Sequence, residues 1–215
     1  MMQIAIALFP QVTVLDAIGP YEVLQRLPDA TVVFVGEQKG EVRSDNGFLG
    51  LTIDATYDEV PSPDVVVVPG GQGTRPLIAD DDNPIISWIQ KVHPTTRFTT
   101  SVCTGSLVLA AAELLDGLTA ATHWGAYDIL EDYGATPTGE RVVEHLDEHI
   151  LTAAGVSSGI DMALRLSELL VDKTAAEAMQ LMIEYDPQPP FDAGSVDKAG
   201  DEVMTRAIEY FADKK

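Results

Sequence analysis

The chain has 215 residues, enough for one well-buried domain, and its 34 acidic and 13 basic residues give a formal net charge of −21. That charge repels nucleic acid and anionic membranes, so we expect neither as a partner. With one cysteine, no signal peptide and no membrane-spanning run, the sequence predicts a cytoplasmic, single-domain protein over residues 1–215, and the acidic excess spread along it predicts a halophilic one.

The first half of the sequence alternates strand and helix patterns. Three short apolar runs, at residues 3–9, 31–35 and 65–68, predict strands buried on both faces. Helical patterns follow at residues 21–27, opened by Gly19-Pro20, and at 84–92, opened by Asp82-Asn83. This alternation predicts a parallel sheet in an α/β layer architecture, whose ligands gather at the carboxyl ends of the strands.

Cys103 lies where a predicted strand, residues 97–102, turns sharply into a predicted helix, residues 107–115. Backbone N–H groups and the positive end of a helix dipole would face the thiol there and lower its pKa. Gly105 would relieve crowding in the turn, as in the strained elbows that carry nucleophiles. The pattern therefore favours a cysteine nucleophile, against the alternative of an inert buried thiol.

The second half predicts helices, a hairpin and an extended tail. The tail contains three prolines, which exclude a helix, and should run over the surface. The predicted elements are a helix at 125–133, a hairpin of strands 141–145 and 149–153 around Asp147-Glu148, helices at 158–171 and 174–185, the tail at 186–196, and a last helix at 201–211.

Asp16 follows the first strand, so it should lie at the same sheet edge as Cys103. Its apolar neighbours would desolvate the carboxylate and raise its pKa, which suits a group that shares a proton with a thiol. A helix cap is the alternative role. Gly70 and Gly71, after the strand at 65–68, would present backbone N–H groups to a developing negative charge, or would serve only a turn.

The stretch Gly155-Val156-Ser157-Ser158-Gly159 matches the elbow of serine hydrolases, but no histidine follows it as that fold requires. We interpret it as a small-residue loop that approaches the site, and we assign Val156 to the substrate or oxyanion site. His145 and His149 flank a charged hairpin tip that is expected to be solvated, so we predict no metal site.

Several of these motifs resemble the ThiJ/PfpI superfamily, which has the class I glutamine amidotransferase-like fold. The resemblance covers nearly the whole chain and is greatest to the isocyanide hydratase branch. It implies a flavodoxin-like three-layer sandwich with a mostly parallel central sheet and a cysteine nucleophile elbow. The motifs that carry it are residues 15–23, 68–71, 101–106, 122–124, 155–161 and 185–191.

The resemblance implies roles for individual residues. Cys103 would be the nucleophile, Asp16 the carboxyl that exchanges a proton with it, and Thr104 a neighbouring hydrogen-bonding group. Gly71 would supply a backbone N–H, and His123 would be structural or face the substrate. Members with peptidase or amidotransferase activity often carry histidine directly after the cysteine, so Thr104 argues against those activities.

The implied function is that of a homodimeric hydro-lyase. Water adds to a small isocyanide through a thioimidate on Cys103, Asp16 moves the protons, and the product is an N-substituted formamide. No metal or organic cofactor is implied. Two alternatives stay open: a glyoxalase or stress protein that acts on 2-oxoaldehydes, and a non-enzymatic sensor in which Cys103 is oxidised.

Overall fold

The computed structural model describes residues 1–80 and 82–212, and the chain forms two compact units, Met1–Ile183 and Glu184–Lys215. The strands are β1 (Met2–Ala7), β2 (Ala30–Gly36), β3 (Gly40–Arg43), β4 (Gly50–Ile53), β5 (Ala55–Thr56), β6 (Val65–Val68), β7 (Phe98–Val102), β8 (Thr119–Ala121), β9 (Thr136–Thr138), β10 (Val142–His145) and β11 (Ile150–Ala153). The α-helices are α1 (Val14–Leu24), α2 (Thr74–Ile78), α3 (Pro84–Val92), α4 (Gly105–Ala111), α5 (Tyr127–Asp132), α6 (Ser158–Leu170), α7 (Lys173–Met182) and α8 (Asp201–Ala212). Short 3-10 turns are η1 (Tyr57–Glu59), η2 (His93–Thr95) and η3 (Trp124–Ala126).

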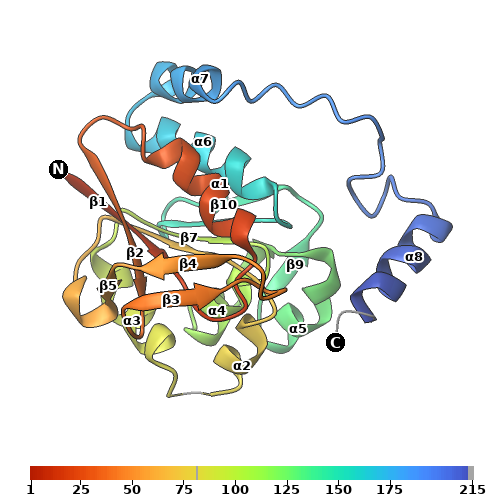
Figure 1. The fold of residues 1–215 in the computed structure, drawn as a ribbon, viewed down its shortest axis with the longest axis horizontal. Coiled ribbons are helices and arrows are strands. Elements are labelled where there is room, and N and C mark those ends of the chain that lie inside the picture. Colours follow the sequence, from red (N-terminus) through yellow and green to blue (C-terminus); the bar gives the residue numbers. More distant parts are fainter. Residues whose placement is uncertain (81, 213–215) are drawn as a thin grey trace. The chain divides into compact units, whose positions relative to one another are not determined.

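A seven-stranded sheet in the order β10-β11-β7-β6-β1-β2-β5 forms the centre of the first unit. All neighbouring pairs are parallel except β10 with β11. Helix α1 packs on α6, whereas α4 contacts α2, α3 and α5, and Figure 1 shows these two groups on opposite sides of the sheet. The structure thus confirms the α/β sandwich with a mostly parallel sheet, and the antiparallel hairpin around Asp147-Glu148.

The buried strands are those at the middle of the sheet. Every residue of β6 is buried, as is β1 from Ile4 onward. The prediction that 31–35 is buried on both faces is wrong, because β2 neighbours only the two-residue edge strand β5 on its outer side, and Thr31 is exposed. The predicted start of α3 is confirmed, since the Asn83 side chain accepts a hydrogen bond from the Ile85 N–H at 3.3 Å.

The first helix begins at Val14 rather than at residue 21, with Pro20 inside it. Gly19 and Pro20 therefore do not open the helix but form its contact with α6. A Cβ added at Gly19 would lie 3.1 Å from Ile160 Cγ1, and one added at Gly159 would lie 3.2 Å from Pro20 Cδ. The free energy gained by close packing of α1 on α6 offsets the free energy lost with the hydrogen bond that a proline removes from a helix interior.

The β3–β4 hairpin was not predicted from the sequence. Its turn contains Asn46-Gly47, a strong hairpin signal, and Gly47 has a φ of 75°. The turn lies against the segment before α1, since the Asp45 N–H donates to the Val12 carbonyl at 3.0 Å and Thr13 Oγ1 lies 3.3 Å from Asp45 Oδ2. The hairpin therefore borders the part of the chain that carries Asp16.

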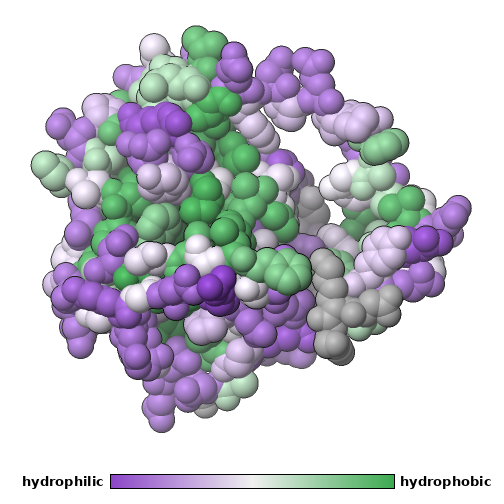
Figure 2. All heavy atoms as spheres, viewed as in Figure 1, coloured by the Kyte–Doolittle hydropathy of each residue, from purple (hydrophilic) through white to green (hydrophobic). Residues whose placement is uncertain are grey.

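The second unit contains the proline-rich tail, which has no regular structure over residues 186–192, and helix α8, in which no residue is buried. On the visible face of the protein, Figure 2 shows hydrophilic residues widely distributed, in keeping with 34 acidic residues. Among the described residues, none belongs to a helix that is long and apolar enough to cross a membrane.

Candidate active site

Cys103 occupies a strained elbow between β7 and α4. Its φ is 58°, in the left-handed region that residues with a side chain rarely adopt, and only 5% of its surface is exposed. The Cys103 N–H donates to the carbonyls of Ala153 and Ala154, each at 3.0 Å. The predicted position of the cysteine at a strand-to-helix hinge is confirmed.

Hydroxyl groups and a close glycine contact fix this elbow. Ser106 Oγ and Thr122 Oγ1 both donate to the Cys103 carbonyl, each at 3.1 Å. A Cβ added at Gly105 would lie 2.1 Å from the Val68 carbonyl oxygen, so only glycine fits there. A left-handed backbone conformation at a residue with a side chain costs about 1–3 kcal/mol, and these contacts stabilise it.

Asp16 lies in the first turn of α1, is fully buried, and is close enough to Cys103 to share a hydrogen bond with its thiol. Its Oδ2 accepts the Gly70 N–H at 2.9 Å, and no described residue donates an N–H or O–H to its Oδ1. Burial raises the pKa of this carboxyl to about 7, against the lowering effect of the Gly70 and Cys103 hydrogen bonds. The prediction of a desolvated carboxyl with a raised pKa is therefore confirmed.

The prediction of a lowered thiol pKa is wrong. Burial and the negative charge of Asp16 raise the pKa of Cys103 to about 12, while the N–H groups of Val156 and Thr104 act in the opposite direction. Helix α4 begins two residues after the cysteine and spans seven residues, so its dipole is a small contribution. The Asp16 carboxyl shares a hydrogen bond with the thiol and is therefore placed to take its proton when a thiolate forms.

Thr104 connects the two glycines to the elbow. Its Oγ1 accepts the Gly71 N–H at 2.9 Å and a hydrogen bond from Thr74 Oγ1 at 3.1 Å. The Gly70 N–H is likewise engaged, by Asp16. Each of these two N–H groups thus holds a side chain of the site, and their predicted donation to a developing negative charge stays a prediction. Gly71 has a φ of 138°, which agrees with the alternative role of a turn residue that needs a positive φ.

Val156 lies in the turn after β11 and contacts the sulfur of Cys103. It lies between β11 and α6 with a φ of 37°, which is strained for a β-branched residue. Its backbone N–H hydrogen-bonds the Cys103 thiol and lowers the thiol pKa. The sequence places Val156 near the site through its loop, but the strain and the contact with sulfur were not predicted.

His123 lies at the periphery of the site. Its Nδ1 accepts the Gly125 N–H at 3.1 Å, and its ring is tight against Gly155, where an added Cβ would lie 2.9 Å from His123 Cδ2. Burial lowers the pKa of the imidazole, which favours the neutral ring. His123 thus packs on the loop that carries Val156.

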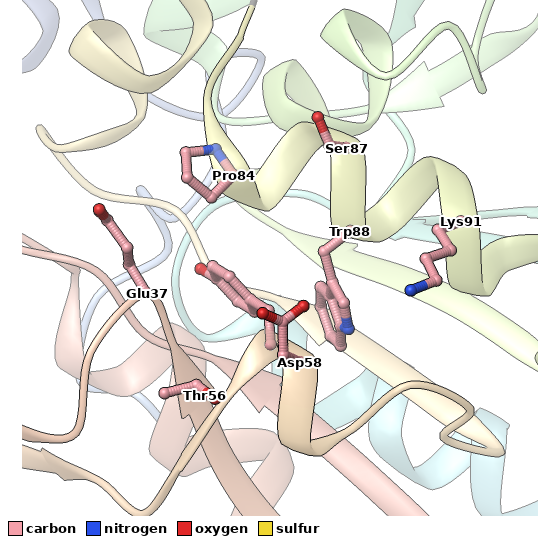
Figure 3. A pocket seen from close by; sticks show the side chains of 8 residues that line it. Glu37, Thr56, Asp58, Pro84, Ser87, Trp88 and Lys91 are labelled. Atoms are coloured by element: carbon pink, nitrogen blue, oxygen red, sulfur yellow. The ribbon is translucent and has the colours of Figure 1, made fainter.

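A separate hollow of about 380 Å³ lies between η1 and α3 (Figure 3). Tyr57 and Trp88 stack in its wall, with ring centroids 5.0 Å apart. Among the described residues that line it, none is a predicted site residue; they are Glu37, Thr56, Tyr57, Asp58, Pro84, Ser87, Trp88 and Lys91. No three of the described His, Cys, Asp and Glu side chains gather as a metal-binding group would require.

A parallel α/β sandwich with a strained cysteine elbow, a buried carboxyl and a backbone N–H on the sulfur defines a class of cysteine-dependent α/β proteins. The family model described as DJ-1/PfpI matches residues 2–169. The chain therefore belongs to the DJ-1/PfpI family, which confirms the resemblance found in the sequence.

Relatives of known sequence or structure agree with this assignment. The isonitrile hydratase of Pseudomonas putida is 45% identical over 206 residues, which cover 96% of this chain and 88% of that protein. A ThiJ/PfpI family protein from Pseudomonas syringae superposes with a TM-score of 0.91 at 38% identity, covering 99% of this chain and 86% of that one. GbdR, a helix-turn-helix transcriptional regulator of Pseudomonas aeruginosa, is 30% identical over 64% of this chain, which corresponds to only 37% of the regulator.

Proposed function

We propose that this protein is an isocyanide hydratase, a cofactor-independent hydro-lyase. The observation that carries the proposal is the 45% identity to an isonitrile hydratase over nearly the full length of both chains. The pairing of Cys103 with a carboxyl whose pKa is about 7 supports it, because this pair can move one proton at neutral pH.

In the proposed reaction, the Cys103 S–H bond breaks and sulfur bonds to the terminal carbon of the isocyanide. The thiol proton passes through Asp16 to that carbon, which gives a thioimidate, R–N=CH–S–Cys. Water then adds to the same carbon and the C–S bond breaks; one proton of the water goes to nitrogen and the other passes through Asp16 to the sulfur. The product is R–NH–CHO, and the enzyme regains its starting protonation.

The other site residues position this pair. Val156 offers its N–H to the sulfur when negative charge develops there. Thr104 holds Gly71, and Gly70 holds Asp16 in place for proton transfer. His123, as a neutral ring against Gly155, supports the Val156 loop.

The test is a product assay with an alkyl isocyanide and with methylglyoxal, run side by side in molar salt. Wild-type protein is expected to yield the matching formamide, Cys103→Ala none, and rapid mixing an adduct of one substrate mass on Cys103. Lactate from methylglyoxal without any formamide would instead establish the glyoxalase alternative. Selective oxidation of Cys103 with neither product would establish the sensor.

The proposed setting is a salt-rich cytoplasm, with the protein acting as a homodimer. The net charge of −21 supports the first part, because like charges repel strongly unless salt screens them. Leu181 and Met182 of α7, 77% and 61% exposed, support the second. The melting temperature should rise from low salt to about 1 M salt, and an unchanged melting temperature would contradict the salt-rich setting. Light scattering should give twice the mass of one chain, and the mass of a monomer would contradict the homodimer.

A further inference from the structure

Arg141 holds both ends of the loop that joins β11 to α6. Its carbonyl accepts the Ala154 N–H at 3.0 Å, and its Nη2 donates to Ser157 Oγ at 3.2 Å. Its Nε forms an ion pair with Asp161 in the first turn of α6. The loop between these anchors contains Gly155 and Val156.

Val156 needs such an anchor. A β-branched residue at a φ of 37° relaxes unless its surroundings hold it, and this conformation is what aims its N–H at the Cys103 sulfur. The segment is partly open to solvent, since Ser157 is exposed and residues 154–156 are only half-buried. Packing alone therefore constrains it less than it constrains the buried cysteine elbow.

We propose that Arg141 is a positioning residue that sets the reactivity of Cys103. By fixing Ala154, Ser157 and Asp161, it keeps the Val156 N–H on the sulfur and so favours the thiolate. Arg141 acts through this loop, and no contact with the thiol is required. The proposal rests on Cys103 as the nucleophile of the proposed function, but not on the identity of the substrate.

The expected effect is moderate and depends on salt. The side chains of Arg141 and Asp161 are 49% and 29% exposed, so their attraction is screened by salt. The hydrogen bond to Ser157 is less sensitive to screening. Loss of the arginine side chain should therefore weaken the hold on Val156 without unfolding α6.

The experiment is a pH titration of the ultraviolet absorbance of the Cys103 thiolate, with a Cys103→Ala version of each variant as its blank. This signal reports the charge on sulfur rather than its accessibility. Arg141→Gln should reduce the thiolate fraction at a given pH by about threefold to tenfold. Ser157→Ala and Asp161→Asn should each shift it in the same direction by a smaller factor.

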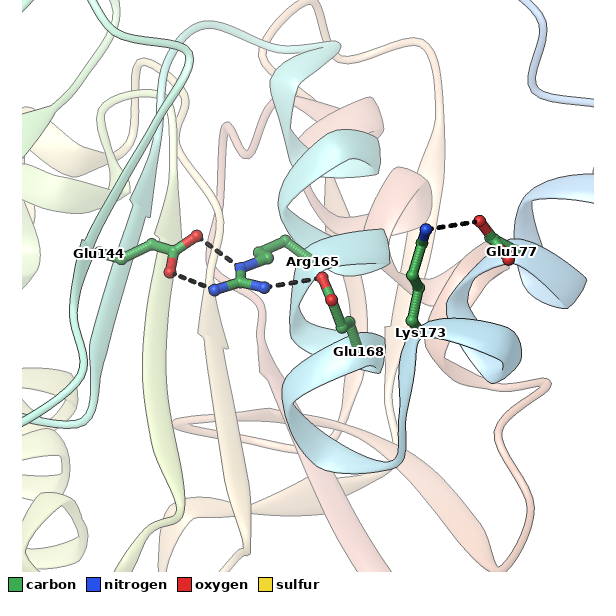
Figure 4. A network of polar contacts seen from close by, with 5 residues as sticks. All are labelled: Glu144, Arg165, Glu168, Lys173 and Glu177. Carbon is green, nitrogen blue, oxygen red and sulfur yellow. Dashed lines mark hydrogen bonds and ion pairs between the residues drawn. The ribbon is translucent and has the colours of Figure 1, made fainter.

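Arg165→Gln is the matched control. Arg165 lies on α6, whereas Arg141 directly precedes β10. Arg165 pairs with Glu144, at 2.7 and 2.9 Å, and with Glu168, at 2.7 Å, and these contacts do not involve the Val156 loop (Figure 4). This variant should lower the melting temperature and leave the thiolate titration unchanged.

An unchanged titration in folded Arg141→Gln, or an equal shift in Arg165→Gln, would overturn the proposal. If Arg141→Gln does not fold, the exposed Ser157→Ala variant decides: a shift supports the proposal and none overturns it. Since no isocyanide is used, failure of the hydratase reaction leaves this result intact.

Discussion

The site combines two neighbouring turns of similar geometry but different surroundings. Strands β7 and β11 are parallel neighbours, with Val102 opposite Ala153, and each is followed by a turn that contains a non-glycine residue of positive φ. The first turn places Cys103 at 58° and the second Val156 at 37°. One strained residue supplies the sulfur and the other the N–H that faces it.

The two turns differ in what fixes them. Cys103 is buried, and its backbone N–H and carbonyl are both bonded within the core. The second turn lies nearer the solvent and is held by Arg141 from the surface. Substitutions in the first turn should therefore affect folding, whereas those in the second should affect mainly the chemistry of the thiol.

The largest expected difference between the turns is in their dependence on pH. Asp16, beside the first turn, has its pKa raised from 3.8 to about 7, so its favourable effect is present at low pH and is lost as pH rises through about 7. Asp16→Asn should therefore become more stable than wild type toward about pH 8, by up to about 4 kcal/mol. The loss extends from about pH 4 to about pH 7, so thermal melts in molar salt between about pH 4 and pH 8 measure this difference.

Ser157→Ala is the control for that prediction, because Ser157 is an exposed residue of the second turn whose side chain does not ionise. Its melting temperature should differ from wild type by a constant amount across the same range. Parallel melting curves for wild type and Asp16→Asn would show that Asp16 ionises normally.

Methyl groups added at the two turn glycines should give the next largest difference. A Cβ at Gly105 would lie 2.1 Å from the Val68 carbonyl oxygen, which is fixed within β6, whereas a Cβ at Gly155 would meet the movable ring of His123 at 2.9 Å. Gly105→Ala should cost about 3 kcal/mol or more, and lower the melting temperature by about 6–12 °C. Gly155→Ala should cost about 1 kcal/mol; equal losses would mean that the turns are equally rigid.

Hydroxyl deletions should give the smallest difference. Thr104→Val leaves the Gly71 N–H without its acceptor, at a cost of about 1–3 kcal/mol in unfolding free energy, whereas the Thr74 hydroxyl keeps the Gly71 carbonyl at 2.8 Å. Ser157→Ala removes an exposed hydroxyl and should change stability by less than about 0.5 kcal/mol. Denaturant unfolding measures both, and Thr104→Ser should restore most of the loss. A neutral Thr104→Val would exclude this network as a stabilising element.

The sequence was sufficient for the elements whose signals are local. Cys103 in its elbow follows from a β-branched strand, a cysteine and a glycine in close succession. The placement of Asp16 at the same sheet edge follows from the parallel topology. The start of α1 was misplaced, because Gly19-Pro20 signals a helix start locally, and its contact with α6 involves residues about 140 positions away.

The remainder of the site depends on contacts that no local pattern encodes. The positive φ of Val156 has no sequence signal, since valine disfavours it. Arg141 lies beside Ser157 because the β10–β11 hairpin pairs the neighbouring Val142 with Ala153. Whether the pKa of Cys103 is raised or lowered depends on how completely the chain buries the thiol beside Asp16. The sequence indicates this burial only in part.

The edges of the sheet also determine whether molecules aggregate. One edge strand, β5, has only two residues. The other edge strand, β10, contains Glu144, which pairs with Arg165. It also contains His145, whose Nε2 lies 2.7 Å from the Thr119 carbonyl oxygen. In about 1 M salt the screening length falls to about 3 Å, so repulsion between acidic surfaces no longer keeps copies apart. Because β5 is short and β10 carries charged side chains that are bonded within the molecule, neither edge strand offers another molecule a long backbone for strand pairing. Resistance to intermolecular sheet growth in brine is thus a property of strand length and edge chemistry rather than of net charge.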